Sequence, residues 1–114
     1  MFSILRTFAQ NSQGQAMAVY VDNEQIMWRG KKWCHLVADS LDELHAFAVK
    51  LGLRRSWFQS EATYPHYDVT LHLRHRALAL GALHGDRRTI IACAKSLKVQ
   101  LQKPRANVQL TLSF

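Results

Sequence analysis

The sequence predicts an α/β fold: a single small domain with a mixed sheet and about three helices packed on it. Segments typical of strands alternate with segments typical of helices, which favours an α/β layer over a helical bundle or a β-sandwich. The chain has 114 residues, and two domains of half that length would each be implausibly small. Its 48% hydrophobic and 20% charged residues fit a packed core and argue against wholesale disorder.

Two short apolar strands are predicted first. Residues 18–22 are apolar and β-branched and close at Asp22, which is typical of a strand followed by a turn. Residues 28–33 form a basic turn flanked by tryptophans. That turn leads into a second apolar strand over residues 34–38.

Capping signals mark both ends of the helix that follows. Ser40 and Glu43 have the spacing of a capping box, in which the hydroxyl accepts a free backbone N–H and the carboxylate reaches back. An apolar stripe with helical spacing then runs to Gly52, which ends the helix. After it, residues 54–59 predict a third strand and residues 60–65 a loop.

The next predicted elements are one extended segment and two helices. Residues 66–69 are expected to be extended. Thr70 can cap a helix that runs to Gly81. Asp86 can cap a longer helix that ends near Gln102.

The domain is predicted to occupy residues 17–103, with an extension on each side. Residues 1–16 form an N-terminal extension that ends in a polar linker, and the predicted domain begins at Met17. Residues 104–114 form a C-terminal extension, and the alternation of apolar and polar residues over 108–114 predicts a half-buried strand there. No apolar run approaches the roughly 20 residues of a membrane span, so we expect no membrane partner.

Basic residues gather in the last part of the chain. The formal net charge is +7, and residues 69–114 hold eight bases against one acid. This asymmetry predicts an anionic partner, with a merely solvated face as the alternative. In the helix after Asp86, one face about 100° wide carries the candidate nucleic-acid-binding residues. They are Arg87, Arg88, Lys95 and Lys98. Ile91 interrupts this basic stripe without an evident reason.

The tryptophan-flanked turn and the two cysteines are open to simpler interpretations. Residues 28–33 can offer stacking platforms beside basic side chains, although core-facing tryptophans of a hairpin are the simpler interpretation. Cys34 and Cys93 match neither a disulfide framework nor a zinc spacing, so they are expected to be buried thiols of a cytoplasmic protein. The chain also lacks a glycine-rich phosphate loop, a nucleophile elbow and a C-x-x-C pair. Of the kinds of catalytic chemistry considered, these absences leave one that uses carboxylates and histidines.

The sharpest local motif is H-Y-D at residues 66–68. In an extended segment His66 and Asp68 share a face and lie roughly 6.6 Å apart. The pair suits a general base or two ligands of a divalent metal. The alternative is a loop hydrogen bond for the histidine and a helix cap for the aspartate. If the next helix continued back to Asp68, it would share a polar stripe with His72, His75 and Arg76, able to bind phosphate or to face solvent.

Other ionisable residues lie within the predicted strands, at the ends of these strands, or on the first predicted helix. Asp22 and Asp39 each end a strand, where open α/β sheets place sites but where turns and caps also use acids. His35 lies within the second strand and has a structural interpretation as well. His45 lies on the flank of the first helix as a boundary residue.

Over about residues 17–98 these segments resemble a small bacterial domain family of unknown function. The motifs that carry the resemblance are V-D at 21–22, W-x-H-L-V-x-D-S-L-D-E-L-H-A-F-A at 33–48, R-R at 54–55 and H-Y-D-V at 66–69, with Arg76 and Gly81-Ala82 fitting the later part. The resemblance implies a compact cytoplasmic domain and brings no activity with it. It implies a shared polar site at Asp22, His35, Asp39, His45, His66 and Asp68. His72, His75 and His84 do not match the pattern, and residues 60–65 are longer than the family's usual stretch.

The resulting hypothesis is a hydrolase-like enzyme acting on a phosphorylated or nucleic-acid substrate. His35 and His66 would join Asp68 at the strand ends, with His66 as the base. A divalent metal would be held by Asp22, Asp39 and Asp68. Arg55 or Arg76 would neutralise developing negative charge. The alternatives are a non-catalytic nucleic-acid-binding module that uses the 87–98 face, and a regulatory or interaction domain that forms a homodimer through its 108–114 edge strand.

Overall fold

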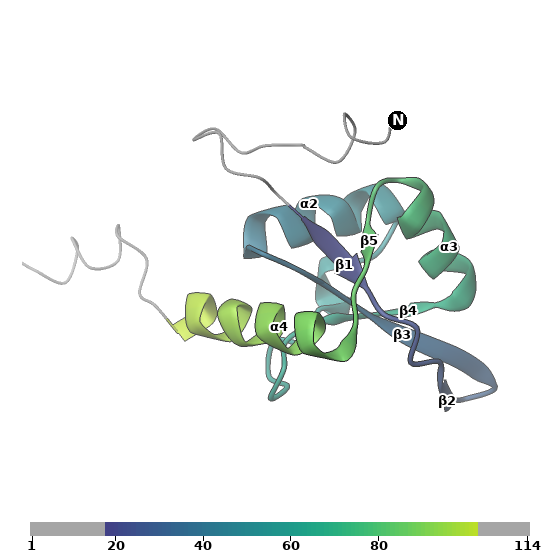
Figure 1. The fold of residues 1–114 in the computed structure, drawn as a ribbon, viewed down its shortest axis with the longest axis horizontal. Helices are drawn as coiled ribbons and strands as arrows, with labels where there is room; N and C mark the ends of the chain where they lie inside the picture. Colours follow the sequence, from purple (N-terminus) through teal and green to yellow (C-terminus); the bar gives the residue numbers. More distant parts are fainter. Residues whose placement is uncertain (1–17, 103–114) are drawn as a thin grey trace, which may run out of the picture.

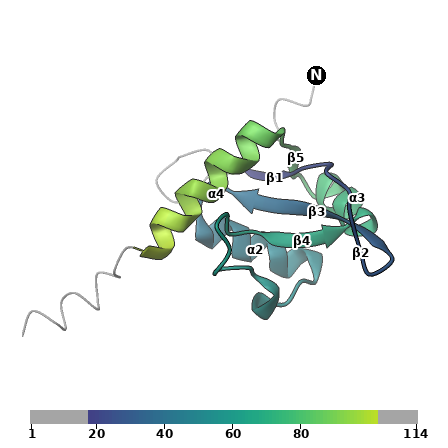
Figure 2. The ribbon, with the colours of Figure 1, turned by 90° about the horizontal axis from the view of Figure 1, so that it is seen from below.

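A mixed five-stranded sheet forms the middle of the fold in the computed structural model, which describes residues 18–102 (Figures 1 and 2). Helix α4 lies on one face of this sheet, and helix α2 lies on the other with α3 packed beside it. The predicted α/β architecture with about three helices is therefore confirmed. The predicted extension at residues 1–16 and the predicted strand at 108–114 lie outside the described residues.

The sheet is organised around its longest strand, β3 (Lys31–Ala38). β1 (Val19–Val21) and β2 (Ile26–Trp28) pair antiparallel with successive halves of the same edge of β3. β4 (Tyr67–Thr70) pairs antiparallel with the opposite edge. β5 (Leu83–His84) lies parallel to β1 and was not predicted, because two exposed residues are too few to show an alternating pattern. Both edges of β3 are thus occupied, and its buried residues lie toward its C-terminal end.

Helix α2 (Leu41–Leu51) begins and ends at the residues that the sequence predicts. The Ser40 hydroxyl accepts the Glu43 backbone N–H at 3.2 Å, and the Glu43 carboxylate accepts the Ser40 N–H at 3.1 Å. Gly52 adopts the left-handed conformation at φ 84°, which a glycine reaches without steric cost, and its N–H closes the last turn. The predicted capping box is confirmed.

The two later helices also start where the sequence predicts. Thr70 caps α3 (Leu71–Ala79), its hydroxyl accepting a backbone N–H of the first turn. Asp86 precedes α4 (Arg87–Gln102) and accepts the Thr89 N–H at 2.9 Å. Within residues 18–102, no helix combines the length and the apolar character needed to cross a bilayer.

One prediction of local structure is wrong. Residues 54–59 do not form a strand: Arg55–Trp57 is a short 3-10 helix, η1, and all three of its residues are exposed. An exposed segment has no buried face to favour pairing, and the sheet contact is limited to one bridge between Gln59 and His66. The polar stripe that would need a helix continuing back to Asp68 does not form, because α3 begins only at Leu71, after a cap residue with extended backbone.

The largest part of the core lies between the sheet and the α2–α3 side. Alternate residues of β3 and β4 point to that side and are fully buried, among them Cys34, Leu36 and Val69. Leu44 of α2 packs into the same cluster.

Cys34 and Cys93 are both free and buried, as predicted. Burial raises the pKa of the Cys93 thiol to about 12, so this sulfur stays protonated and inert at neutral pH.

Gly85 sets how closely α4 approaches the sheet. A Cβ at this buried position would lie 2.9 Å from Cδ1 of Ile90 and 3.0 Å from Cβ of Tyr20. The Tyr20 atom is fixed to the backbone of β1, so the helix side would have to move. We expect Gly85→Ala to lower the free energy of unfolding by about 1–3 kcal/mol in urea titrations. The double variant Gly85→Ala/Ile90→Val should recover part of the loss, and a single variant as stable as the native chain would contradict this account.

Candidate functional site

The register of β3 and β4 brings two histidines and an aspartate together on one face of the sheet. His35 and Asp68 are direct partners across the antiparallel pair. His66 precedes Asp68 by two residues in an extended segment, so both side chains project from the same face. One ligand atom from each of the three residues lies within 4.8 Å of the others. We call His35, His66 and Asp68 the His–Asp cluster.

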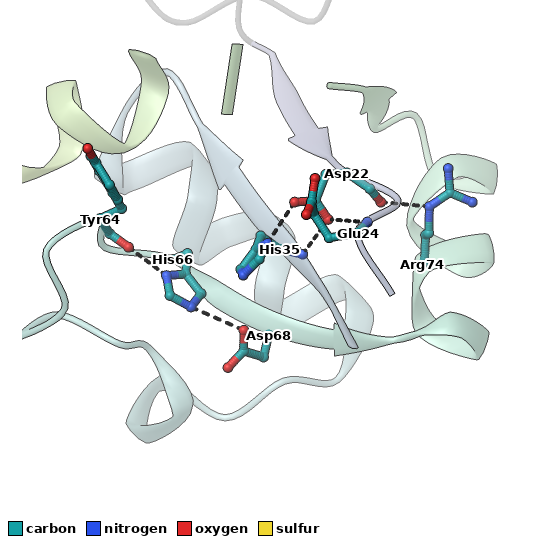
Figure 3. A network of polar contacts seen from close by, with 7 residues as sticks. All are labelled: Asp22, Glu24, His35, Tyr64, His66, Asp68 and Arg74. Atoms are coloured by element: carbon teal, nitrogen blue, oxygen red, sulfur yellow. Dashed lines mark hydrogen bonds and ion pairs between the residues drawn. The ribbon is translucent and has the colours of Figure 1, made fainter. Parts of the chain in front are cut away.

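Asp22 holds the ring of His35 in a fixed orientation (Figure 3). Its Oδ2 lies 2.7 Å from Nδ1 of His35, and its Oδ1 accepts the backbone N–H of the same residue at 2.8 Å. Oδ1 also accepts the Glu24 N–H at 3.3 Å. Because a carboxylate only accepts, Nδ1 carries the proton. In the neutral ring of His35 the other nitrogen, Nε2, is therefore unprotonated, and it turns toward His66 (Figure 3).

Both ring nitrogens of His66 face oxygen acceptors. Its Nδ1 donates to the backbone carbonyl of Tyr64 at 2.5 Å. Its Nε2 lies 3.1 Å from Oδ1 of Asp68. The two imidazole rings meet edge to face with centroids 4.9 Å apart. Both histidines therefore have Nδ1 bound to an acceptor and Nε2 on the side where the carboxylate of Asp68 lies, and Nε2 of His66 is paired with that carboxylate.

The Asp22–His35 pair also changes the protonation of both partners. The hydrogen bond from Asp22 raises the pKa of His35 against the opposing effect of burial, and the charges of Asp22 and Asp68 raise it further. Burial alone would raise the pKa of Asp22, but the hydrogen bonds and charge of His35 outweigh it and the net pKa is lowered. Asp22 is therefore an anion throughout the neutral range, as its orienting role requires.

A break between β1 and β2 positions Asp22. The N–H of Asp22 donates to His35 O, and pairing resumes only at Ile26, opposite Trp33. Residues 23–25 bulge out between these two points, and bulges of this kind re-aim side chains beside functional sites. Arg74 of α3 secures the turn, because its Nε donates to the carbonyl of Asp22 at 2.7 Å.

Two hollows meet at the His–Asp cluster. The smaller has a volume of about 350 Å³ and is lined by Asp22, Arg87 and Ile91 among others. The larger has a volume of about 950 Å³ and runs along β4. His35 and His66 line both, so the cluster is reachable from either side.

Some of the residues predicted for the site lie elsewhere. Asp39 is at the far end of β3, about 13 Å along the strand from His35, where it contacts Cys93 Sγ at 3.6 Å. Arg55 in η1 and Arg76 in α3 are exposed, and neither lines a hollow. His45 lies on the opposite side of the sheet and bonds the Tyr67 hydroxyl at 2.9 Å.

Other participants were missed by the sequence interpretation. Tyr64 acts through a backbone carbonyl, which leaves no mark in a sequence. Arg74 had no signal that set it apart from the other polar residues of α3. Arg87 was placed on a separate nucleic-acid-binding face, yet it lines the smaller hollow beside the cluster. Ile91, which interrupts the basic stripe of α4, lines that hollow too, and this explains its presence there.

The fold and the site define a small α/β domain with an imidazole–carboxylate cluster on one face of its sheet. Residues 19–97 match the model of the family described as "Protein of unknown function (DUF4031)". Because the match covers more than half of the chain, the protein belongs to this family. Searches of curated proteins and of solved structures found no match.

Proposed function

We propose that this protein is a small metal-dependent hydrolase that acts on phosphorylated or nucleic-acid substrates. The observation that carries the proposal is the bonding of the two imidazoles, and a metal ion bound there would take the place of the contact between Nε2 of His66 and Asp68. His35 and His66 each have Nδ1 bound to an acceptor and Nε2 directed into a space shared with Asp68. Metal-ligating histidines almost always have their other ring nitrogen bound in this way.

The donor set fits a divalent transition metal. Two imidazoles and one carboxylate form the ligand set of several catalytic zinc sites and of ferrous sites, in which further positions stay open. Asp22 does not belong to the group of three within 4.8 Å, and its bond to His35 fits an orienting role better than the ligand role predicted from sequence. Asp39 is too far along β3 to contribute a ligand with Asp68.

Hydrolysis follows from what such a site supplies. A bound divalent metal lowers the pKa of a coordinated water to near neutrality. His66 cannot act as a free base through the same Nε2 that serves as a ligand, and its bonding pattern favours the ligand role. Arg87 in the adjoining hollow presents a permanent positive charge. That charge favours a phosphate group over a neutral ester as the substrate moiety.

Metal binding is the direct test. We expect the full chain, stripped of metal, to bind Zn²⁺, Mn²⁺ or Fe²⁺ in calorimetric titrations. His66→Ala and Asp68→Ala should each weaken metal binding by about 100-fold or more. Each variant loses a ligand, and the loss of a residue that only orients a ligand already lowers metal affinity about 10- to 100-fold. His72→Ala is the matched control, because His72 is an exposed imidazole outside both hollows. Circular dichroism should show native folding for all three variants.

An assay of hydrolysis tests the proposed reaction separately from the proposed metal site. The metal-loaded protein should hydrolyse bis(4-nitrophenyl) phosphate, and the His66 and Asp68 variants should not. Equal metal affinity in the native chain and in both ligand variants would overturn the site. Metal binding that depends on both residues but brings no hydrolysis of phosphate esters would overturn the proposed reaction.

A further inference from the structure

The three tryptophans of the chain gather at one place, the larger hollow beside the His–Asp cluster. Trp28, Trp33 and Trp57 all line it, although they come from β2, β3 and η1. Trp28 is 56% exposed and Trp57 50% exposed. The indole N–H of Trp33 is bound to the carbonyl of Trp28 at 3.0 Å, which fixes the first two relative to each other. Large aromatic faces are thus open to solvent around a hollow that leads to the proposed metal site.

Positive charges lie against these aromatic faces. The guanidinium of Arg29 lies 4.6 Å from the ring centroid of Trp28, and that of Arg54 lies 5.8 Å from that of Trp57. Lys31 lines the same hollow. The carboxylates in contact with the hollows belong to the cluster, to its orienting Asp22 and to the exposed Glu24. Apart from these groups, the rim pairs flat aromatic surfaces with cations.

The basic face of α4 continues this surface on the other side of the cluster. Arg87 lines the smaller hollow, which shares Ile26, His35 and His66 with the larger one. Arg88 and Lys95 are exposed further along the same helix face. A single path therefore runs from the α4 cations, across the His–Asp cluster, into the tryptophan-lined hollow.

We propose that the substrate of this site is a single-stranded nucleic acid that lies along this path. The inference rests on the proposed hydrolase function and names its substrate. Unpaired bases would stack on Trp28 and Trp57, since stacking on aromatic side chains is how proteins hold strands whose base faces are free. Arg87 and the following cations of α4 would contact backbone phosphates. A phosphodiester would then pass over the cluster. In a duplex the base faces are covered by their neighbours, so these platforms would stay empty.

Binding in EDTA tests the strand separately from any reaction. A fluorescently labelled dT12 or rU12 oligonucleotide should bind the metal-free full chain in anisotropy titrations at low salt, and should quench its tryptophan fluorescence. Trp28→Ala and Trp57→Ala should each weaken binding about 5- to 100-fold, and Trp57→Phe should restore most of the affinity. Both side chains are half exposed, so these variants should fold normally.

Two basic positions supply a matched pair for the phosphate contacts. Arg87→Ala should weaken binding and reduce the salt slope by about 0.7 per lost single-strand phosphate contact. Arg76→Ala removes the same charge from an exposed site that lines neither hollow, and should leave affinity and slope nearly unchanged.

The outcomes distinguish this inference from the function on which it rests. Absence of oligonucleotide binding, equal affinity for a 12-base-pair duplex, or equally effective competition by poly-glutamate would overturn the substrate assignment, and bis(4-nitrophenyl) phosphate would still report on hydrolysis. Cleavage of the bound strand on addition of metal, lost in His66→Ala, would support both. A strand that binds as described but is never cleaved would overturn its assignment as substrate, and so the path would be a binding surface only.

Discussion

Asp22→Asn is expected to weaken metal binding about 10- to 100-fold although His35, His66 and Asp68 all remain. The native carboxylate accepts from three N–H groups: the backbone N–H groups of His35 and Glu24 at Oδ1, and Nδ1 of the His35 ring at Oδ2. An asparagine has only one accepting oxygen. The side chain must therefore face one of these two sites with an NH₂ group, which donates only.

The substitution should reverse the tautomer of His35. The asparagine oxygen keeps more hydrogen bonds by staying with the two backbone N–H groups, so its NH₂ faces Nδ1. Nδ1 must then accept, and the ring proton moves to Nε2. That nitrogen is the one turned toward His66, and once protonated it cannot bind a metal. A substitution that preserves the shape of the side chain thus changes a ligand atom that lies one hydrogen bond and two ring bonds away.

Calorimetry and ¹⁵N NMR of the histidine rings are the measurements. The native chain should show a protonated Nδ1 at His35 in its neutral ring, and Asp22→Asn a protonated Nε2. Glu24→Gln is the matched control, because it makes the same charge change two residues away on an exposed side chain that lines the same hollow. Native metal affinity in Asp22→Asn would show that Asp22 does not orient the ligand.

The sequence predicted features whose signals are local. The cap of α2 needs only Ser40, Glu43 and Gly52, three residues that act within one helix, and it formed as expected. The same holds for the shared face of His66 and Asp68, which follows from the two-residue period of an extended chain. The strand predicted at residues 54–59 does not form, because this segment has no buried face to favour pairing.

The rest of the site depends on contacts between distant segments. His35 meets Asp68 because the register of β3 and β4 places them opposite each other, and no local pattern fixes that register. Arg87 reaches the same place only because α4 crosses the sheet, so its charge was assigned to a separate function. Asp22 was recognised as an acid at the end of a strand, but its role depends on a bulge that no sequence signal predicts. Residue types were therefore predictable, and their partnerships were not.

The buried carboxyl group of Glu43 should make the free energy of unfolding depend strongly on pH. Its side chain is buried at the start of α2, and its Oε2 has no hydrogen-bond partner among the described residues. Burial, aided by the nearby charge of Asp39, raises the pKa of Glu43 from 4.5 to about 7, against the lowering effect of the capping hydrogen bonds. Between these two values the folded protein binds more protons than the unfolded chain. The free energy of unfolding should therefore fall as the pH rises through this window.

Glu43→Gln should remove this loss and keep the cap, because the amide oxygen can still accept the Ser40 N–H. Well below pH 4.5 the two proteins should be nearly equal in stability, since the native carboxyl is then protonated in both the folded and the unfolded state. Above pH 7 the variant should be more stable by about 3 kcal/mol, the free energy that corresponds to the raised pKa. Urea unfolding from about pH 3 to about pH 8 measures the difference. Asp42→Asn, which neutralises an exposed acid in the same helical turn, should leave the native pH profile in place. Parallel profiles for the native chain and Glu43→Gln would mean that the buried carboxylate is solvated after all, and that the capping box carries no penalty at neutral pH.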